Sequence, residues 1–162
     1  MSSKTIGLYI GKFQPFHNGH LYAIAAIAPT VDLLIIVIGS SQYSGLKNQP
    51  FSARQRRQMI EQTLKAEGIN NFSIVEVPDI HDSEHWVEHV KKYVKQFNVV
   101  FTNSEVVQQL FSDKGFTVKS IKVLPGVSGT LVRQKIAAQE NDWISLVPSA
   151  TASIINASLI SS

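Results

Sequence analysis

The feature that most constrains the fold is an unbroken run of six apolar residues, Leu33–Ile38. A strand with one face in water alternates apolar and polar residues, so this run predicts a strand covered on both faces, as in a parallel sheet. Other short runs rich in β-branched residues are also strand-like: Thr5–Ile10, Phe72–Val77, Val99–Thr102 and Val118–Leu124. Segments typical of helices separate and follow these runs: Asn18–Ala28, Ser52–Glu67, Ser83–Gln96, Ser104–Ser112 and Ser128–Ala138.

This alternation of strands and helices predicts an α/β fold with a Rossmann-like, doubly wound parallel sheet. The length of 162 residues is that of one domain. We therefore expect a single domain over residues 1–162, with the Ser- and Ala-rich end, about residues 149–162, forming a peripheral helix. The sequence Ser52-Ala53-Arg54-Gln55 predicts a capping box at the start of its helix.

The composition excludes several classes of function. The sequence has no cysteine, which removes disulfides, thiolate metal sites and cysteine nucleophiles. The formal charge of +3 is not gathered into a basic run, so we expect no nucleic-acid partner. No apolar segment is long enough to span a membrane, and the N-terminal stretch does not have the pattern of a signal peptide. We expect a soluble, cytoplasmic protein without a membrane partner.

Ligands of open α/β sheets bind beyond the carboxyl ends of the strands, so the loop after the first strand is a candidate site. It reads GKFQPFHNGH, which is neither a dinucleotide fingerprint nor a Walker loop. It offers Gly11, Lys12 and two imidazoles, His17 and His20, at the start of a helix whose free N–H groups attract anions. This combination suits phosphate oxygens. The simpler structural interpretation is that one histidine caps the helix and the other packs inside.

A second helix start lies far along the chain, at Ser128-Gly129-Thr130, with Arg133 one turn further on. Locally this pattern predicts a helix cap. Its functional interpretation is a second set of N–H groups and hydroxyls for phosphate, supported by an arginine. Two phosphate-binding helix starts favour a triphosphate over a monophosphate.

The string GKFQPFHNGHL resembles the first signature of the nucleotidyltransferase superfamily, and in particular the GRFQPFH-x-GHL form of archaeal-type nicotinamide mononucleotide adenylyltransferases. Lys12 stands where this family usually has arginine, and Gly45 where many members have histidine. Further segments resemble the family in the same order along most of residues 5–150: Gly39–Gln42, Asn48–Arg56, Pro78–Ile80, Trp86-Val87, Val127–Arg133 and Trp143–Pro148.

The resemblance implies an enzyme that transfers the adenylyl group of ATP to nicotinamide mononucleotide (NMN), forming NAD and pyrophosphate. It implies four catalytic residues, with His20 at the α-phosphate and the other three at the β- and γ-phosphates: His17, Lys12 and Arg133. Further residues implied to bind ATP are Gly11, Phe13, Gln14, Arg56, Ser128, Gly129 and Thr130, and those implied to bind NMN are Ser40, Asp79 and Trp86. Mg²⁺ bound through the ATP phosphates, no metal site on the protein, and a homo-oligomer are also implied.

The sequence also allows several alternatives. Trp86 has the helical spacing of a core residue. The segment His85-Trp86-Val87-Glu88-His89 has the H-x-x-E-H pattern of a zinc hydrolase, although a polar, solvated helix face explains it as well. Within the superfamily the acceptor could be nicotinate mononucleotide or phosphopantetheine. Outside catalysis, the protein could be a nucleotide-binding sensor.

Overall fold

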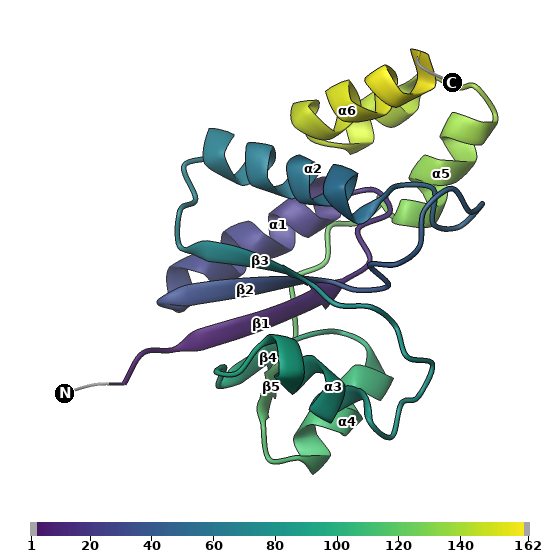
Figure 1. Ribbon diagram of the computed structural model, residues 1–162. Helices are drawn as coiled ribbons and strands as arrows, with labels where there is room; N and C mark the ends of the chain where they lie inside the picture. Colours follow the sequence, from purple (N-terminus) through teal and green to yellow (C-terminus); the bar gives the residue numbers. More distant parts are fainter. Residues whose placement is uncertain (1–2, 161–162) are drawn as a thin grey trace.

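The computed structural model describes residues 3–160 and contains a five-stranded parallel sheet in the order β3-β2-β1-β4-β5 (Figure 1). The strands are β1 (Ile6–Gly11), β2 (Leu33–Ile38), β3 (Phe72–Glu76), β4 (Val99–Phe101) and β5 (Thr117–Lys119). The α-helices are α1 (Asn18–Ile27), α2 (Ala53–Ala66), α3 (Trp86–Tyr93), α4 (Glu105–Asp113), α5 (Gly129–Ala137) and α6 (Ser149–Ile160), and two 3-10 helices are η1 (Ala28–Thr30) and η2 (Asp142–Leu146). The expected doubly wound α/β fold is confirmed.

Helices cover both faces of the sheet, as the unbroken apolar run predicted. Successive residues of β2 point to opposite faces, so Ile36 joins the core beneath α1 and α2, while Val37 joins the core against α3 and α4. Figure 1 shows α1 and α2 on one side of the sheet and α3 and α4 on the other. Both faces of β2 are therefore dry, which explains why none of its positions is polar.

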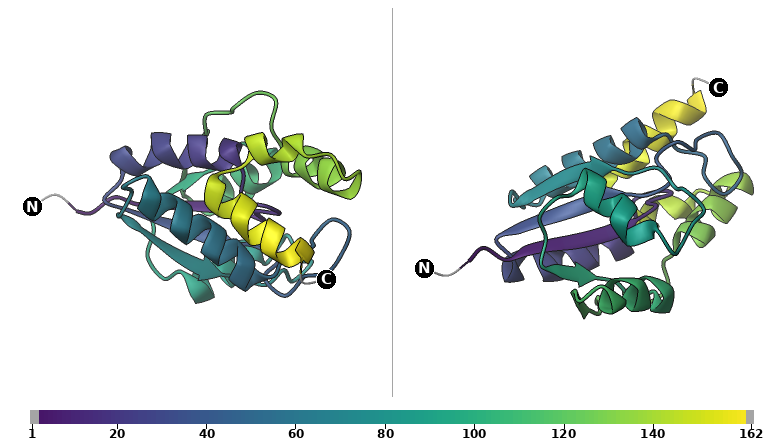
Figure 2. Two further views of the ribbon diagram at one scale, coloured as in Figure 1. Left: turned by 90° about the horizontal axis from the view of Figure 1, so that it is seen from above. Right: turned by 60° about the horizontal axis from the view of Figure 1, so that its bottom comes forward.

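The C-terminal helix α6 packs against α2 on the outside of that layer, as the view from above shows (Figure 2). Its buried residues are Thr151, Ala152 and Ile155. The last two residues of the helix expected over 149–162 lie outside the described residues. Within residues 3–160, no helix has both the length and the apolar character that a membrane crossing requires.

Two boundaries predicted from the sequence were wrong. The helix expected over Ser83–Gln96 is shortened to α3 because residues before it form a loop, in which Asp82 accepts hydrogen bonds from the backbone and ring of His85. The strand expected over Val118–Leu124 is reduced to β5 because the side-chain amide of Asn103 bonds both backbone groups of Ile121. Those bonds replace the ladder bonds that a longer strand would make.

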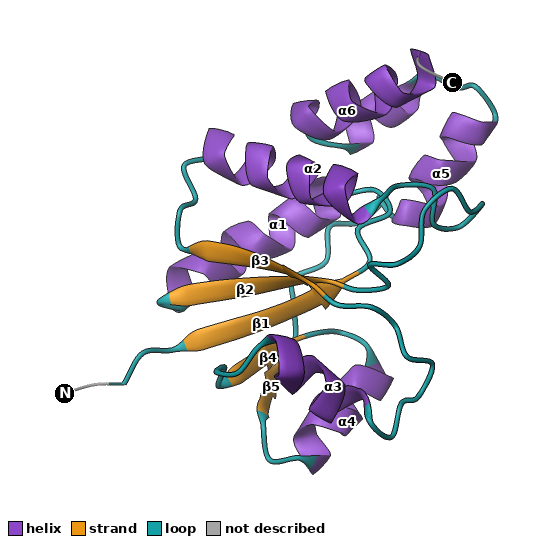
Figure 3. Cartoon of the chain, in the orientation of Figure 1, coloured by secondary structure: helices purple, strands orange, loops and turns teal. Residues whose placement is uncertain are grey.

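All five strands run in the same direction, so their carboxyl ends and the loops that follow them gather at one edge of the sheet (Figure 3). The chain order reverses between β1 and β4, which lie side by side in the middle of the sheet. A ligand crevice is expected at such a switch point, beyond the carboxyl end of β1.

Candidate active site

Two pockets open at this edge of the sheet, each of about 590 Å³. The first, here called the histidine pocket, is lined by residues that include Lys12, His17, His20, Asn48, Thr130 and Arg133. The second, here called the tryptophan pocket, is lined by residues that include Lys12, Ser40, Asp79, Trp86, Val106 and Leu110. Lys12 lines both pockets, so the two pockets adjoin at this residue.

The two histidines are held at the start of α1 by backbone donors. Nδ1 of His17 accepts the N–H of Gly19 (3.0 Å), and Nδ1 of His20 accepts the N–H of His17 (3.1 Å). His17 is thus the N-cap of α1, and its ring stacks on that of His20 with 3.6 Å between centroids. Because each Nδ1 is an acceptor, a neutral ring carries its proton on Nε2 and keeps that N–H to donate. Helix capping and hydrogen-bond donation to a ligand were alternatives in the sequence. In the structure, one arrangement of the two histidines allows both.

Gly19 makes this arrangement possible. A Cβ at this position would lie 2.9 Å from Cε1 of the His17 ring and 3.2 Å from Val127. No side chain fits there without displacing the imidazole. The glycine of the H-x-G-H pattern is therefore required by the packing of the first histidine.

The histidines are uncharged at neutral pH. Burial, with the positive charge of Arg133, lowers the pKa of His17 from 6.5 to about 4. Burial, with the nearby His17, holds the pKa of His20 well below its usual range. The ring of Phe16 stacks on His20 and that of Phe13 meets it edge-on, at 4.7 Å between centroids. The rings are thus fixed, neutral hydrogen-bond donors.

The start of α5 faces the same pocket. Oγ of Ser128 accepts the N–H of Leu131 (3.1 Å) and caps the helix, so the capping interpretation holds for this residue. Gly129, Thr130 and Arg133 line the histidine pocket. The Arg133 guanidinium donates to the backbone oxygen of Gln14 (2.7 Å) and to Oγ1 of Thr130 (3.2 Å), which fixes it beside the first loop. Two helix N-termini, distant in sequence, therefore meet at one anion-attracting pocket.

Phe13 and Gln14 line the histidine pocket, but their side chains are engaged with the protein. The amide of Gln14 makes reciprocal bonds with the backbone of Phe51, each of 2.9 Å. Phe13 has a left-handed backbone (φ 54°) and packs its buried ring over Gly11, where a Cβ would lie 2.8 Å from that ring. These residues shape the loop and support His20.

Arg56, expected from the resemblance to bind ATP, is completely buried. All of its guanidinium contacts are backbone oxygens, those of Ser52, Lys12, Gly39, Ser40 and Tyr43. A side chain without exposed surface cannot reach a phosphate in the histidine pocket. The geometry therefore gives Arg56 a different position from the one expected, inside the protein beneath the loops.

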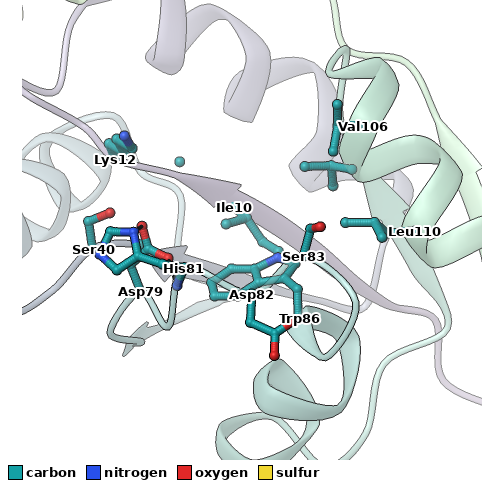
Figure 4. Close-up of a pocket in the computed structure, with 13 residues that line it drawn as sticks. Ile10, Lys12, Ser40, Asp79, His81, Asp82, Ser83, Trp86, Val106 and Leu110 are labelled. Carbon is teal, nitrogen blue, oxygen red and sulfur yellow. Dashed lines mark hydrogen bonds and ion pairs between the residues drawn. The ribbon is translucent and has the colours of Figure 1, made fainter.

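The tryptophan pocket has one polar and one apolar wall, with Trp86 between them (Figure 4). The backbone of Asp79 is paired with the side-chain amide of Gln42 (2.8 and 2.9 Å). The Asp79 carboxylate accepts the N–H of His81 (2.8 Å), whose ring bonds the Tyr43 hydroxyl (2.7 Å). The apolar wall is formed by α4, where Val106 is 64% exposed. This pocket suits a flat, aromatic group with polar substituents.

Comparisons with known proteins show the family of this chain. Residues 8–135 match the model of the cytidylyltransferase-like family. The chain is 39% identical to a nicotinamide-nucleotide adenylyltransferase of Picrophilus torridus over 149 residues, which is 91% of this chain and 88% of the relative. It is 40% identical to a nicotinamide-nucleotide adenylyltransferase of Methanocorpusculum labreanum over 151 residues, 92% of this chain and 89% of the relative. The chain belongs to the nicotinamide-nucleotide adenylyltransferase family. It is therefore a nucleotidyltransferase enzyme.

The fold is also found among solved structures. A bifunctional NMN adenylyltransferase/ADP-ribose pyrophosphatase of Francisella tularensis superposes with a TM-score of 0.72 at 23% identity. The match covers 95% of this chain and 52% of that one. At this identity the similarity shows the shared fold.

The H-x-x-E-H segment does not form a metal site. Nε2 of His89 lies 2.8 Å from the backbone oxygen of Pro78, and the His85 ring is paired with Asp82 (2.7 Å). The carboxylate of Glu88 pairs with Lys114 (2.9 Å). Over residues 3–160, there is no group of three or more His, Asp or Glu side chains that could hold a metal ion.

Sequence reasoning missed several residues that line the pockets. Asn48 and Gln49 reach the histidine pocket from the loop before α2, and His81, Ser83, Val106 and Leu110 line the tryptophan pocket. Val106, near the start of α4, could have been predicted to line the pocket, because exposed apolar side chains beyond the carboxyl ends of the strands often contact a ligand. Asn48 and Gln49 stood in a segment that resembles the family, although neither was assigned to a pocket.

Proposed function

We propose that this protein transfers the adenylyl group of ATP to NMN and releases NAD and pyrophosphate. The observation that carries the proposal is the meeting of the two pockets at Lys12. One pocket offers neutral N–H donors, two helix N-termini and an arginine, as a triphosphate requires. The other offers an indole surface for a pyridine ring. The two reacting phosphates would then approach each other where the pockets join.

The histidine pocket binds the phosphates of ATP in this proposal. His20 donates from Nε2 to the α-phosphate, and His17 and Arg133 hold the β- and γ-phosphates. Thr130 and the free N–H groups at the start of α5 support them, while Ser128 keeps that helix start in place. These donors are fixed before the reaction, so they stabilise developing negative charge with little reorganisation.

Lys12 acts at the junction. The resemblance placed it at the β- and γ-phosphates, but its position between the pockets supports a role in neutralising the acceptor phosphate and the α-phosphate together. An oxygen of the NMN phosphate attacks the α-phosphorus, the bond from that phosphorus to the bridging oxygen breaks, and pyrophosphate leaves with the electron pair. The attacking phosphate is already an anion, so no general base is needed. Alignment of the two phosphates provides much of the rate acceleration.

The tryptophan pocket receives NMN. Its pyridinium ring is a cation, and Trp86 offers the aromatic face that binds cations best, a contribution of about 0.5–2 kcal/mol. Asp79 and Ser40 lie on the polar wall (Figure 4), and in this proposal that wall faces the ribose and the carboxamide. The apolar wall of α4 covers the other side of the ring.

Magnesium enters as part of the substrate, bound to the ATP phosphates. The described residues that line the histidine pocket carry no carboxylate, so the protein contributes cations and N–H groups there and the phosphates hold the metal. The Francisella structure, complexed with AMP and a manganese ion, supports a divalent cation in this proposal. The metal neutralises phosphate charge and makes pyrophosphate a better leaving group.

The test is an end-point assay with ATP, Mg²⁺ and a panel of acceptors that includes NMN, nicotinate mononucleotide and phosphopantetheine. NAD formed from NMN, and lost in the His20→Ala variant, would support both the reaction and the site. Pyrophosphate formed only with another acceptor would overturn the proposed substrate. ATP binding without any product would identify a sensor. Assembly as a homo-oligomer and a cytoplasmic location also remain proposals, and light scattering and cell fractionation test them.

A further inference from the structure

A buried guanidinium lies directly beneath the two pockets. Arg56 projects from the first turns of α2 and is 0% exposed. Its Nε donates to the oxygen of Ser52 (3.2 Å), at the N-cap of its own helix. Nη1 donates to Lys12 (2.9 Å) and Gly39 (2.9 Å), and Nη2 to Ser40 and Tyr43 (3.3 Å each). A guanidinium has five N–H groups, and the five oxygens named here account for all of them.

The four oxygens outside α2 come from the segments that form the pockets. Lys12, at the junction of the pockets, follows β1, whereas Gly39 and Ser40 follow β2 and line the tryptophan pocket. Tyr43 lies in the loop between β2 and α2, and the same loop brings Asn48 into the histidine pocket. One side chain therefore fixes backbone from both substrate pockets in a single network of hydrogen bonds.

The held backbone has an unfavourable conformation. Ser40 has φ 49°, in the left-handed region that a residue with a side chain rarely adopts, and it is 3% exposed. Its oxygen accepts from Arg56 and also from the N–H of Tyr43 (3.2 Å). Without the guanidinium, several buried oxygens would lose their hydrogen-bond donors. The backbone at Ser40 would then shift toward a more favourable conformation.

We infer that Arg56 is a positioning residue for adenylyl transfer, which sets the distance between the two substrate pockets through the backbone of Lys12, Gly39 and Ser40. This inference rests on the proposed function for its catalytic consequence. Arg56 touches neither substrate. Its hydrogen bonds fix the backbone of Lys12, and so the position of the Lys12 side chain, and they fix the backbone of Gly39 and Ser40 in the wall of the tryptophan pocket. A displacement of the reacting groups by about 1 Å is sufficient to cost about 10²-fold in rate.

Lysine cannot replace this group. Its ammonium has three donors at one point, whereas the oxygens here are arranged around a planar fork. Arg56→Lys keeps the charge and removes the geometry. Arg57→Lys is the matched control, because Arg57 lies on the same helix but is half-buried, pairs with Glu76 (2.9 Å) and lines neither of the two pockets. We expect Arg57→Lys to keep the activity of the wild type.

The experiment compares the two variants by calorimetric binding of ATP and by steady-state kinetics with ATP and NMN. For folded Arg56→Lys we expect a rise in the Kd of ATP of about tenfold or more, a rise in KM for both substrates, and a fall in kcat of about 10²-fold. A folded variant with Kd and kcat within about twofold of the wild type would overturn the inference. A lower kcat with both KM values unchanged would also overturn the inference, because a smaller fraction of correctly folded enzyme is sufficient to explain that result.

A measurement on the wild type covers the case in which Arg56→Lys does not fold. In the held loop, the N–H of Tyr43 bonds the oxygen of Ser40, and the N–H of Ser41 bonds the oxygen of Val77, just after β3. We expect residues 39–43 to exchange hydrogen slowly in the free protein and to change little when ATP is added. Rapid exchange that becomes slow only with ATP would mean that the ligand, and not Arg56, orders this loop. ATP binding and exchange need no acceptor, so they judge this inference even if NMN proves not to be the substrate.

Discussion

Acidification lowers the free energy of unfolding of this protein through His17, by an amount that follows from the low pKa of this buried ring. The pKa of His17 is about 4 in the folded protein and 6.5 in the reference state. The unfolded chain therefore binds a proton between these values while the folded chain does not. Stability due to this group is fully present above pH 6.5 and is lost as the pH falls toward 4. Between pH of about 7.5 and about 4.5, the loss amounts to about 2.5 kcal/mol.

The matched variant is His17→Asn. Asparagine does not titrate, yet it is a favourable N-cap that can accept the N–H of Gly19. Urea unfolding, followed by circular dichroism at both pH values, gives the loss of stability for each protein. The wild type should lose about 2.5 kcal/mol more than the variant. Equal losses, within about 0.5 kcal/mol, would refute the conclusion that His17 is buried as a neutral ring.

Three further substitutions, with His85→Ala as a control, test the site. His20→Ala should lower kcat by about 10²-fold with an unchanged circular dichroism spectrum, whereas His85→Ala, at the surface beside Asp82, should stay within about twofold of the wild type. An unchanged kcat in His20→Ala would remove that residue from the mechanism. Trp86→Ala should raise KM for NMN by about tenfold and leave KM for ATP unchanged; an effect confined to ATP would contradict its placement. Gly19→Ala should cost about 1–2 kcal/mol in urea unfolding and also lower kcat, because its Cβ displaces the His17 ring. Wild-type stability in this variant would show that the ring tolerates a neighbouring methyl group.

The fold was largely predictable because its strongest signals are local. The apolar run of β2 required cover on both faces, and the box formed by Ser52 and Gln55 is present at the start of α2. The errors arose where tertiary contacts override local pattern. Asn103 ends β5 early by bonding Ile121. The apolar spacing typical of a helix extends beyond the end of α3, but there Phe97 stacks on Phe116 instead, at 4.6 Å between ring centroids.

The geometry of the candidate site was predictable where its residues belong to one loop, and less so where it depends on tertiary packing. His17 and His20 stand three residues apart at a helix start, which is sufficient to bring their rings together. By contrast, Arg56 and Arg57 are neighbours in an arginine-rich segment, and the sequence does not distinguish the fully buried one from the half-buried one. The tertiary packing of α2 determines which of the two arginines is buried.

The contact of both pockets with Lys12 has a consequence for inhibition. Under the proposed function, a single molecule that joins an adenosine polyphosphate to a pyridine riboside is expected to occupy both pockets at once. Once one half is bound, the other half experiences an effective concentration set by the short linker, in the millimolar range, rather than its concentration in solution. Such a ligand would gain about 10²–10⁴-fold over either half without any new contact with the protein. The junction at Lys12 therefore also defines where the linker of a bisubstrate inhibitor should lie.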